Sequence, residues 1–389
     1  TYSDTTAIFD EPNVQVYGGV YGTNNATLDF GGSGFTPTLS GYSYLSTANL
    51  PVPAAPNPAD HFHSQVVTHN GTSTASTCSF NLDTYEWLAI IKNTTGAVEK
   101  WYWINSITGV NKYWSSNESG TVTTDANVLT VSGTTFTLGS TLSAKNYLVQ
   151  FHRAGLASET ASNEEGSIST DASSVNLVSG FSMCEFQGTG ANGTIGHGLS
   201  SAPEMVIHKG TTQGGFVYHV GQTDATYYTV LYGANTQAVA ANVWNSTAPS
   251  STVISVGSNG ASNEVGTVMS FSWHSVEGYS AFGSYEGNAS TDGPFINTGM
   301  YAGGIFVKSI DTASTNWTYF SSGADSDNVR QEIYINATSL LSSNSYADVN
   351  SNGTKIRGTF RDVNTAVTFI YGAWGGQPLT DGAINQGRA

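Results

Sequence analysis

The feature that most constrains the fold of this chain is one order of segments that occurs three times. Each copy contains an apolar run that ends in lysine: "YEWLAIIK" to Lys92, "APEMVIHK" to Lys209 and "YAGGIFVK" to Lys308. A short aromatic segment follows each lysine, and a strongly alternating segment closes each copy. Internal repeats of this kind predict a chain built from several similar structural units.

Apolar residues within these segments recur with a period of two. In "VMSFSWHSV", Met269, Phe271 and Trp273 alternate with other residues, which is the pattern of a β-strand. Clusters of Gly, Asn, Ser and Asp separate the segments, as turns between strands do. The sequence therefore predicts an all-β fold of tandem antiparallel β-sandwich modules, of a lectin or jelly-roll type.

The order of the repeated segments also predicts how the chain is divided. Residues 1–61 form an N-terminal β segment that ends in the Pro-rich connector "PVPAAPNPAD". The first β module covers 62–155, and the polar stretch 156–179 is a linker. The second module covers 180–278, and the third covers 279–389 together with a C-terminal tail.

Composition excludes several classes of partner. Only 12 residues are basic and the net charge is −16, so we expect no nucleic-acid binding, which needs clustered Lys and Arg. No run approaches twenty apolar residues, so we expect no membrane insertion. Cys78 and Cys184 lie in apolar alternating runs and are predicted to be buried free thiols. Because the chain begins at Thr1, we expect a processed N-terminus or a piece of a longer polypeptide.

Sequence signatures of catalysis are mostly missing. The chain contains no GxSxG, HExxH or CxxC motif and no Walker loop. One GxGxxG (188–193) leads into "TIGHGLSSAP", which cannot begin the helix that dinucleotide binding needs, so we interpret it as a glycine-rich turn. Glu286 and Asp292 could form a glycosidase pair, but the matching loops of the other copies do not keep two acids. We therefore expect no enzyme activity and no cofactor.

Two histidines are weak candidates for a metal site. His61 and His63 alternate in "DHFH", so on a strand they would share one face. Imidazoles on one face can ligate Zn or Fe when another segment supplies a further ligand. A pair of this kind is more commonly polar strand surface, and we predict no metal.

Aromatic residues are the candidates for ligand binding. Trp101, Tyr102 and Trp103 are consecutive, so at least one of these side chains should face outward from a strand, and Tyr227 and Tyr228 behave likewise. Exposed aromatic faces stack on sugar rings. The alternative is that both faces of these strands are buried between packed modules. The candidate ligand-binding residues are Trp101, Trp103, Tyr227 and Tyr228.

Longer phrases resemble a known family. "GTGANGTIGHGLSSAPEMVIHK" (188–209), "VWNSTAPSSTVISVG" (243–257), "SVEGYSAFGSYEGNASTDGPFINTG" (275–299) and "VNSNGTKIRG" (349–358) are similar to virion structural proteins of marine bacteriophages, including those of cyanobacteria. Members of that family are often described as tail-fibre or host-interaction proteins, and "STANLPVPA" (46–54) resembles the junction between a SPRY or concanavalin-like lectin module and these repeats.

This resemblance implies a function. The chain would be a virion structural protein, a tail fibre or surface appendage, that attaches the particle to the host surface. Its expected partners are other virion proteins and a host cell-surface glycan or protein, and its expected location is the virion surface. The expected oligomer is a homotrimer, which would make weak sugar sites multivalent. The alternatives are a capsid decoration or fibre-shaft protein without a ligand, and a polysaccharide depolymerase.

Overall fold

The computed structural model describes residues 57–325 and 329–376, which belong to one compact unit spanning Ala54–Ala389. Within these residues, nearly all regular elements are β-strands, joined by two 3-10 turns and two four-residue α-helices. The fold class is therefore all-β, as predicted. Most of the predicted N-terminal segment and the C-terminal tail lie outside the described residues. In the described part of the chain, no helix is long and apolar enough to span a bilayer.

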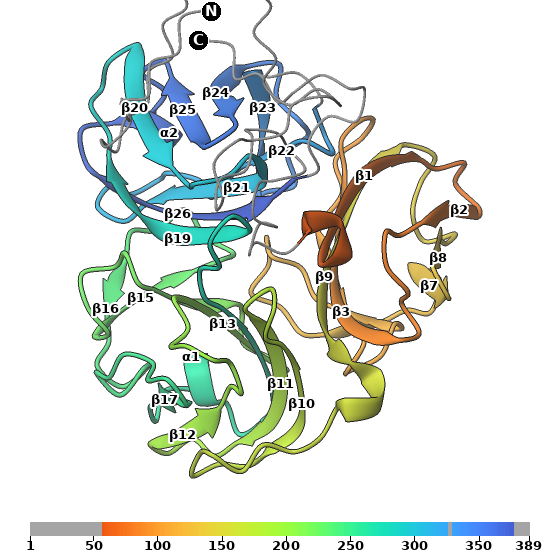
Figure 1. The fold of residues 1–389 in the computed structure, drawn as a ribbon, viewed down its shortest axis with the longest axis vertical. Helices are drawn as coiled ribbons and strands as arrows, with labels where there is room; N and C mark the ends of the chain where they lie inside the picture. The colour runs from red at the N-terminus through yellow and green to blue at the C-terminus, as the bar shows by residue number, and fades with distance from the viewer. Residues whose placement is uncertain (1–56, 326–328, 377–389) are drawn as a thin grey trace, which may run out of the picture. The chain divides into compact units, whose positions relative to one another are not determined.

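Strands β1–β9 form the first module, coloured orange to yellow in Figure 1. Its main sheet has the antiparallel order β1-β9-β3-β4, and two smaller sheets have the orders β2-β8-β7 and β5-β6. The 3-10 turns η2 (Pro58–Asp60) and η3 (Ala157–Glu159) flank these strands. The strands are β1 (Phe62–Thr68), β2 (Thr74–Thr77), β3 (Tyr85–Asn93), β4 (Tyr102–Asn105), β5 (Lys112–Tyr113), β6 (Thr123–Thr124), β7 (Leu129–Ser132), β8 (Thr135–Leu138) and β9 (Asn146–Leu156).

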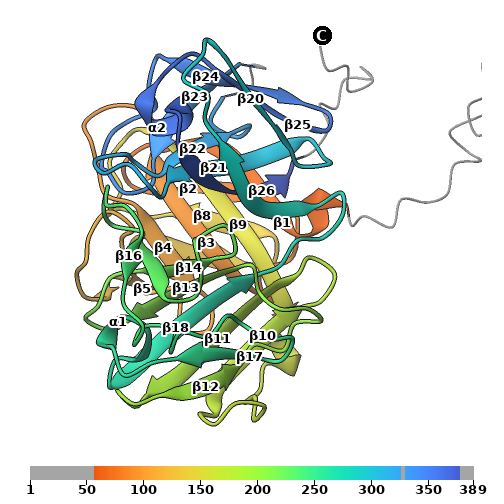
Figure 2. The same cartoon turned by 90° about the vertical axis from the view of Figure 1, so that its left-hand side faces the viewer.

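Strands β10–β18 form the second module, which is green in Figures 1 and 2. Its main sheet has the order β10-β11-β18-β13-β14-β15-β16, and β12 pairs with β17 opposite it. Helix α1 (Gly260–Asn263) precedes the last strand. The strands are β10 (Thr170–Asn176), β11 (Phe181–Gly188), β12 (Gly193–Gly196), β13 (Met205–Gly210), β14 (Phe216–His219), β15 (Tyr227–Val230), β16 (Ala238–Val239), β17 (Val253–Val256) and β18 (Gly266–Trp273).

Strands β19–β26 form the third module, coloured cyan to blue in Figure 1. One sheet of order β19-β26-β21-β22-β23-β24-β25-β20 curls over its own core, and helix α2 (Arg361–Asn364) precedes the last strand. The strands are β19 (Ser280–Glu286), β20 (Asp292–Asn297), β21 (Ala302–Ser309), β22 (Thr318–Ser321), β23 (Val329–Tyr334), β24 (Ser345–Asn350), β25 (Gly353–Arg357) and β26 (Thr368–Gly375).

The central strand of each module is buried on both faces. In β3, Trp87, Ala89 and Ile91 enter the core of the first module, whereas Leu88 and Ile90 enter a second core shared by all three modules. Strands β13 and β21 alternate in the same way between a module core and the shared core. Period-two sequence thus fills two cores at once, which holds the modules together as one packed unit.

Three aromatic side chains meet at the centre of the shared core. His152 lies in the middle of β9, whereas Trp273 and Trp374 lie at the ends of β18 and β26, and the three ring centroids are 5.0–6.0 Å apart. The three residues are equivalent in the repeat. Each lies four residues after the residue of its strand that pairs with the repeated lysine. His152 of the first module therefore corresponds to Trp273 of the second and Trp374 of the third.

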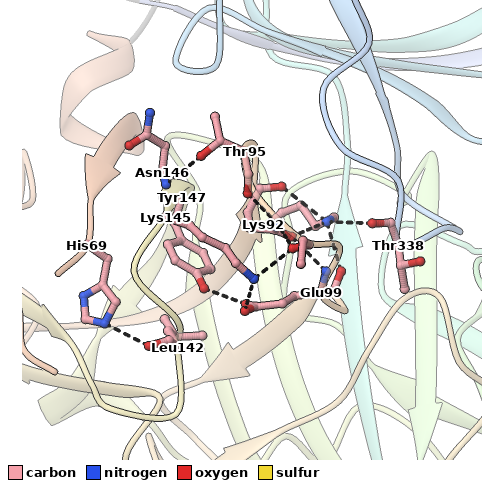
Figure 3. A network of polar contacts seen from close by, with 11 residues as sticks. His69, Lys92, Thr95, Glu99, Leu142, Lys145, Asn146, Tyr147 and Thr338 are labelled. Atoms are coloured by element: carbon pink, nitrogen blue, oxygen red, sulfur yellow. Dashed lines mark hydrogen bonds and ion pairs between the residues drawn. The ribbon is translucent and has the colours of Figure 1, made fainter. Parts of the chain in front are cut away.

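The repeated lysines are buried hydrogen-bond donors. Lys92, Lys209 and Lys308 are at most 2% exposed, and none forms an ion pair with a described residue. Lys92 Nζ donates to the carbonyls of Glu99 (2.9 Å) and Thr338 (3.1 Å), as Figure 3 shows. The other two bind groups of the loop that follows their own strand. Burial lowers the pKa of each lysine to about 8. The lysine repeat therefore fixes loops of the fold.

The interval 156–179, predicted to be a linker, contains a strand. Residues 170–176 form β10, which pairs with β11 at the edge of the second module's sheet. The polar sequence of this strand favoured a linker, but its serine hydroxyls are buried with partners inside the fold. Ser174 Oγ accepts from Gly155 N (3.0 Å), and Ser173 Oγ lies 3.3 Å from Cys184 Sγ. Cys184 and Cys78 are both free and buried, as predicted.

Candidate ligand-binding site

Two of the four predicted aromatic residues are buried, so the prediction that they offer an exposed binding face is wrong. Trp101 is 1% exposed and Trp103 is 5% exposed, because both belong to the shared core. They line a cavity of about 40 Å³, far smaller than the roughly 300–1,000 Å³ of small-molecule sites. The consecutive aromatic residues thus fill both faces of one segment: Trp101 and Trp103 enter the shared core, and Tyr102 enters the core of the first module.

The other two predicted aromatic residues are half-buried. Tyr227 and Tyr228 are neighbours on β15, where they pair with Val239 and Ala238 of β16. The Tyr228 ring lies 5.6 Å from Phe216 and packs against the core of the second module. Both keep some exposed surface, and a binding role for them stays a prediction.

The two candidate metal ligands face different surroundings. His61 Nδ1 lies 2.9 Å from Asn176 Nδ2, and its ring contacts Tyr279. His63 Nδ1 accepts from Ser79 N (3.2 Å). Burial lowers the pKa of each imidazole to about 4. No cluster of three or more His, Cys, Asp or Glu side chains suited to a metal occurs within residues 57–325 and 329–376.

The two acids of the 286–292 loop are exposed. Glu286 Oε1 accepts from Thr368 Oγ1 (2.9 Å), and Asp292 Oδ1 lies 2.8 Å from Lys355 Nζ. The hydrogen bond and charge of Lys355 lower the pKa of Asp292, whereas a glycosidase acid needs a raised one. The flanking strands β19 and β20 pair with β26 and β25 and not with each other.

A larger pocket lies where the first module meets the second. Its volume is about 340 Å³, and both polar and apolar residues line it. The lining residues are Asn105, Thr108, Lys112, Tyr113, Trp114, Val122 and Thr124 of the first module, and Glu185, Lys209, Gly210, Thr211, Thr267 and Met269 of the second.

The β5–β6 hairpin builds the first module's side of this pocket. Lys112 pairs with Thr124 and Tyr113 pairs with Thr123, so the hairpin is only two residues long on each strand. Val122 N donates to the Thr211 carbonyl (3.1 Å), which ties the hairpin to the second module. This backbone bond fixes the two sides of the pocket relative to each other.

Opposite charges reach the pocket from the two modules. Lys112 comes from β5 and Glu185 from β11, and neither side chain has a hydrogen-bond or ion-pair partner in the described part of the chain. Burial, with repulsion from Asp171, raises the pKa of the Glu185 carboxyl, and the charge of Lys112 opposes that rise. The buried Lys209 ammonium is already held by the Gly210 and Gln213 carbonyls.

Apolar groups complete the pocket. Tyr113 is 9% exposed, and Trp114 and Met269 are at most 5% exposed, so together they give the pocket an apolar base. The Trp114 indole Nε1 is buried without a hydrogen-bond partner among the described groups. A concave site that combines such a base with a few directed polar groups suits a small polar ligand with one apolar face.

Sequence reasoning missed all of these residues. Tyr113 and Trp114 form an aromatic pair just before a polar stretch, a signal similar to the one that selected Trp101 and Trp103. Glu185 is the only charged residue in the alternating run "FSMCEFQ". A charge within such a run could have marked a site, but the opposite charge, Lys112, is 73 positions away, and only the packing of two modules brings both to one pocket.

Comparison with known proteins gives a family and no relative of known activity. No curated protein and no solved structure matches the chain significantly. A family model described as a domain of unknown function (DUF7483) matches residues 57–378, which include all the described residues up to 376. Because the match covers well over half of the 389 residues, the chain belongs to the DUF7483 family.

Proposed function

We propose that this chain is a non-enzymatic structural protein of a bacteriophage particle, which displays its three β-sandwich modules at the virion surface and attaches to the host surface. The observation that carries the proposal is the mixed polar and aromatic pocket between the first and second modules. The phrases similar to marine phage virion proteins support the setting. Both the location of the chain on a virion and its contact with a host surface are proposed.

The shared core supports a role in display. Side chains from all three modules pack in it, so the pocket is held on a rigid scaffold. Rigid presentation lowers the entropy that a binding site loses on binding. If the proposed trimer forms, weak sites could act together and raise the avidity of the particle by about 10²–10⁴-fold.

The exposed acids favour attachment over hydrolysis. Neither Glu286 nor Asp292 lines the pocket, and the pKa of Asp292 is lowered by Lys355. Within the pocket, Glu185 is the only carboxylate, whereas polysaccharide hydrolysis normally uses two. Binding of a ligand by the residues that line the pocket does not need a second carboxylate, whereas hydrolysis does.

The proposal can be tested with particles and cells. Antibodies raised against the purified chain should label intact particles in electron micrographs. The fluorescently labelled chain should bind host cells saturably, and excess unlabelled chain should compete. Labelling without cell binding would favour a decoration or shaft protein, and the absence of both results would contradict the proposal.

A further inference from the structure

We propose that the pocket between the first and second modules binds an uncharged saccharide, and that Lys112 and Glu185 orient it. This inference names the ligand of the site on which the proposed attachment function rests. The contact between the modules, the unpaired charges and the shape of the pocket each support it.

The boundary that holds the pocket differs from the other two boundaries. Trp101 Nε1 donates to the Tyr334 carbonyl of the third module (2.9 Å), and Trp317 Nε1 donates to the Val230 carbonyl of the second (2.9 Å). Each of these tryptophans directly precedes its strand, β4 or β22. At the same place before β14 the second module has Gly215, so no indole of the second module reaches the first from that position.

Trp114 of the first module lies against this glycine. A Cβ placed on Gly215 would be 3.5 Å from the Trp114 ring. Trp114 lines the pocket, and its Nε1 lacks the carbonyl partner that Trp101 and Trp317 have. The repeat is thus broken at one boundary, and the pocket occurs at that boundary.

The unpaired charges favour a ligand that both donates and accepts hydrogen bonds. Lys112 can only donate, and an ionised Glu185 can only accept. They carry opposite charges into one pocket without forming an ion pair of 4.0 Å or less. An anionic ligand would meet Glu185 and a cationic ligand would meet Lys112. Neighbouring sugar hydroxyls, which donate and accept, satisfy both without adding charge.

The remaining lining suits a sugar ring. Thr108, Thr124, Thr211 and Thr267 supply hydroxyls, whereas Tyr113 and Met269 supply apolar surface for the C–H face of the ring. A volume of about 340 Å³ lies at the low end of the roughly 300–1,000 Å³ of ligand pockets. We therefore expect one or two rings to be bound.

The experiment measures binding of methyl glycosides of glucose, galactose, mannose and N-acetylglucosamine to the full chain by ligand-observed NMR and calorimetry. At least one glycoside should bind. Glu185→Gln and Lys112→Gln should each weaken that binding about tenfold, since each removes one charge-assisted hydrogen bond. Thr124→Trp, which adds a ring at the exposed rim of the pocket, should abolish it.

Glu159→Gln is the matched control, because Glu159 is exposed and lies outside the pocket. The affinity of this variant for the glycoside should stay within twofold of that of the parent protein. Unchanged thermal midpoints would show that the variants fold. Binding of no glycoside, or binding that Glu185→Gln and Thr124→Trp leave intact, would overturn the inference. If the chain binds host cells but no glycoside, the attachment function stands and this pocket is not its binding site. If glycosides bind but host cells do not, the proposed attachment function is wrong and the saccharide site remains.

Discussion

Two of the three module boundaries are sealed by a tryptophan, and the third contains a pocket. Trp101 and Trp317 are buried and give their indole N–H to a carbonyl of the neighbouring module. At the third boundary Gly215 occupies the equivalent position, and the unpartnered Trp114 lines the pocket beside Lys112 and Glu185. The repeated contacts hold the fold together, and the one departure from the repeat leaves room for a ligand.

The largest effect should come from opening a sealed boundary. Trp317 is fully buried between Phe306 and the second module. Trp317→Ala should lower the free energy of unfolding by about 3–5 kcal/mol, because it leaves a cavity and an unpaired carbonyl. Urea unfolding followed by far-UV circular dichroism would measure this loss. A loss below about 1 kcal/mol would mean that this boundary is not part of the cooperative core.

The next effect depends on pH and concerns the centre of the shared core. His152 takes the place that Trp273 and Trp374 take in the other modules, and burial lowers its pKa to about 3. Below pH 6.5 the unfolded chain gains a proton at this residue that the folded chain resists. Stability should therefore be complete above pH 6.5 and fall as the pH drops toward 3, by about 2 kcal/mol per such histidine at pH 5.

His152→Phe isolates that contribution, because phenylalanine keeps a ring and cannot be protonated. The difference between the free energies of unfolding at pH 7.5 and pH 5 should shrink by about 2 kcal/mol in the variant. His61 and His63 also have lowered pKa values and remain in both proteins, so they cancel in the comparison. An unchanged difference would show that His152 is protonated within the fold.

The shared core and the pocket show what the sequence can and cannot predict. The period-two pattern predicted strands and β-sandwich modules, because each residue's place on a strand follows from its neighbours. It did not distinguish an exposed face from one covered by another module, so it left open whether Trp101 and Trp103 are exposed or buried between modules. It also missed the pocket, since Lys112 and Glu185 come together only through packing between modules. Local periodicity specifies elements, and long-range contacts specify the site.

A smaller effect should separate the two kinds of boundary tryptophan. Trp317→Phe removes a hydrogen bond of 2.9 Å to a buried carbonyl, whereas Trp114→Phe removes an N–H that has no partner among the described groups. Trp317→Phe should therefore be more destabilising than Trp114→Phe, by about 1–2 kcal/mol. Paired urea titrations would give the difference. Equal losses would mean that the two boundaries are sealed alike.

The smallest effect should come from the two acids that the sequence left open as a hydrolytic pair. Glu286 and Asp292 are exposed residues of the third module, and neither lines the pocket. Glu286→Gln and Asp292→Asn should leave glycoside binding unchanged and shift the thermal midpoint little, because exposed ion pairs contribute little to stability. The same variants should leave the size distribution of host polysaccharide unchanged after incubation, as the parent protein does. If the parent shortens the polymer and these variants do not, the third module carries a hydrolytic site, and the contrast between sealed and open boundaries no longer identifies the functional part of the molecule.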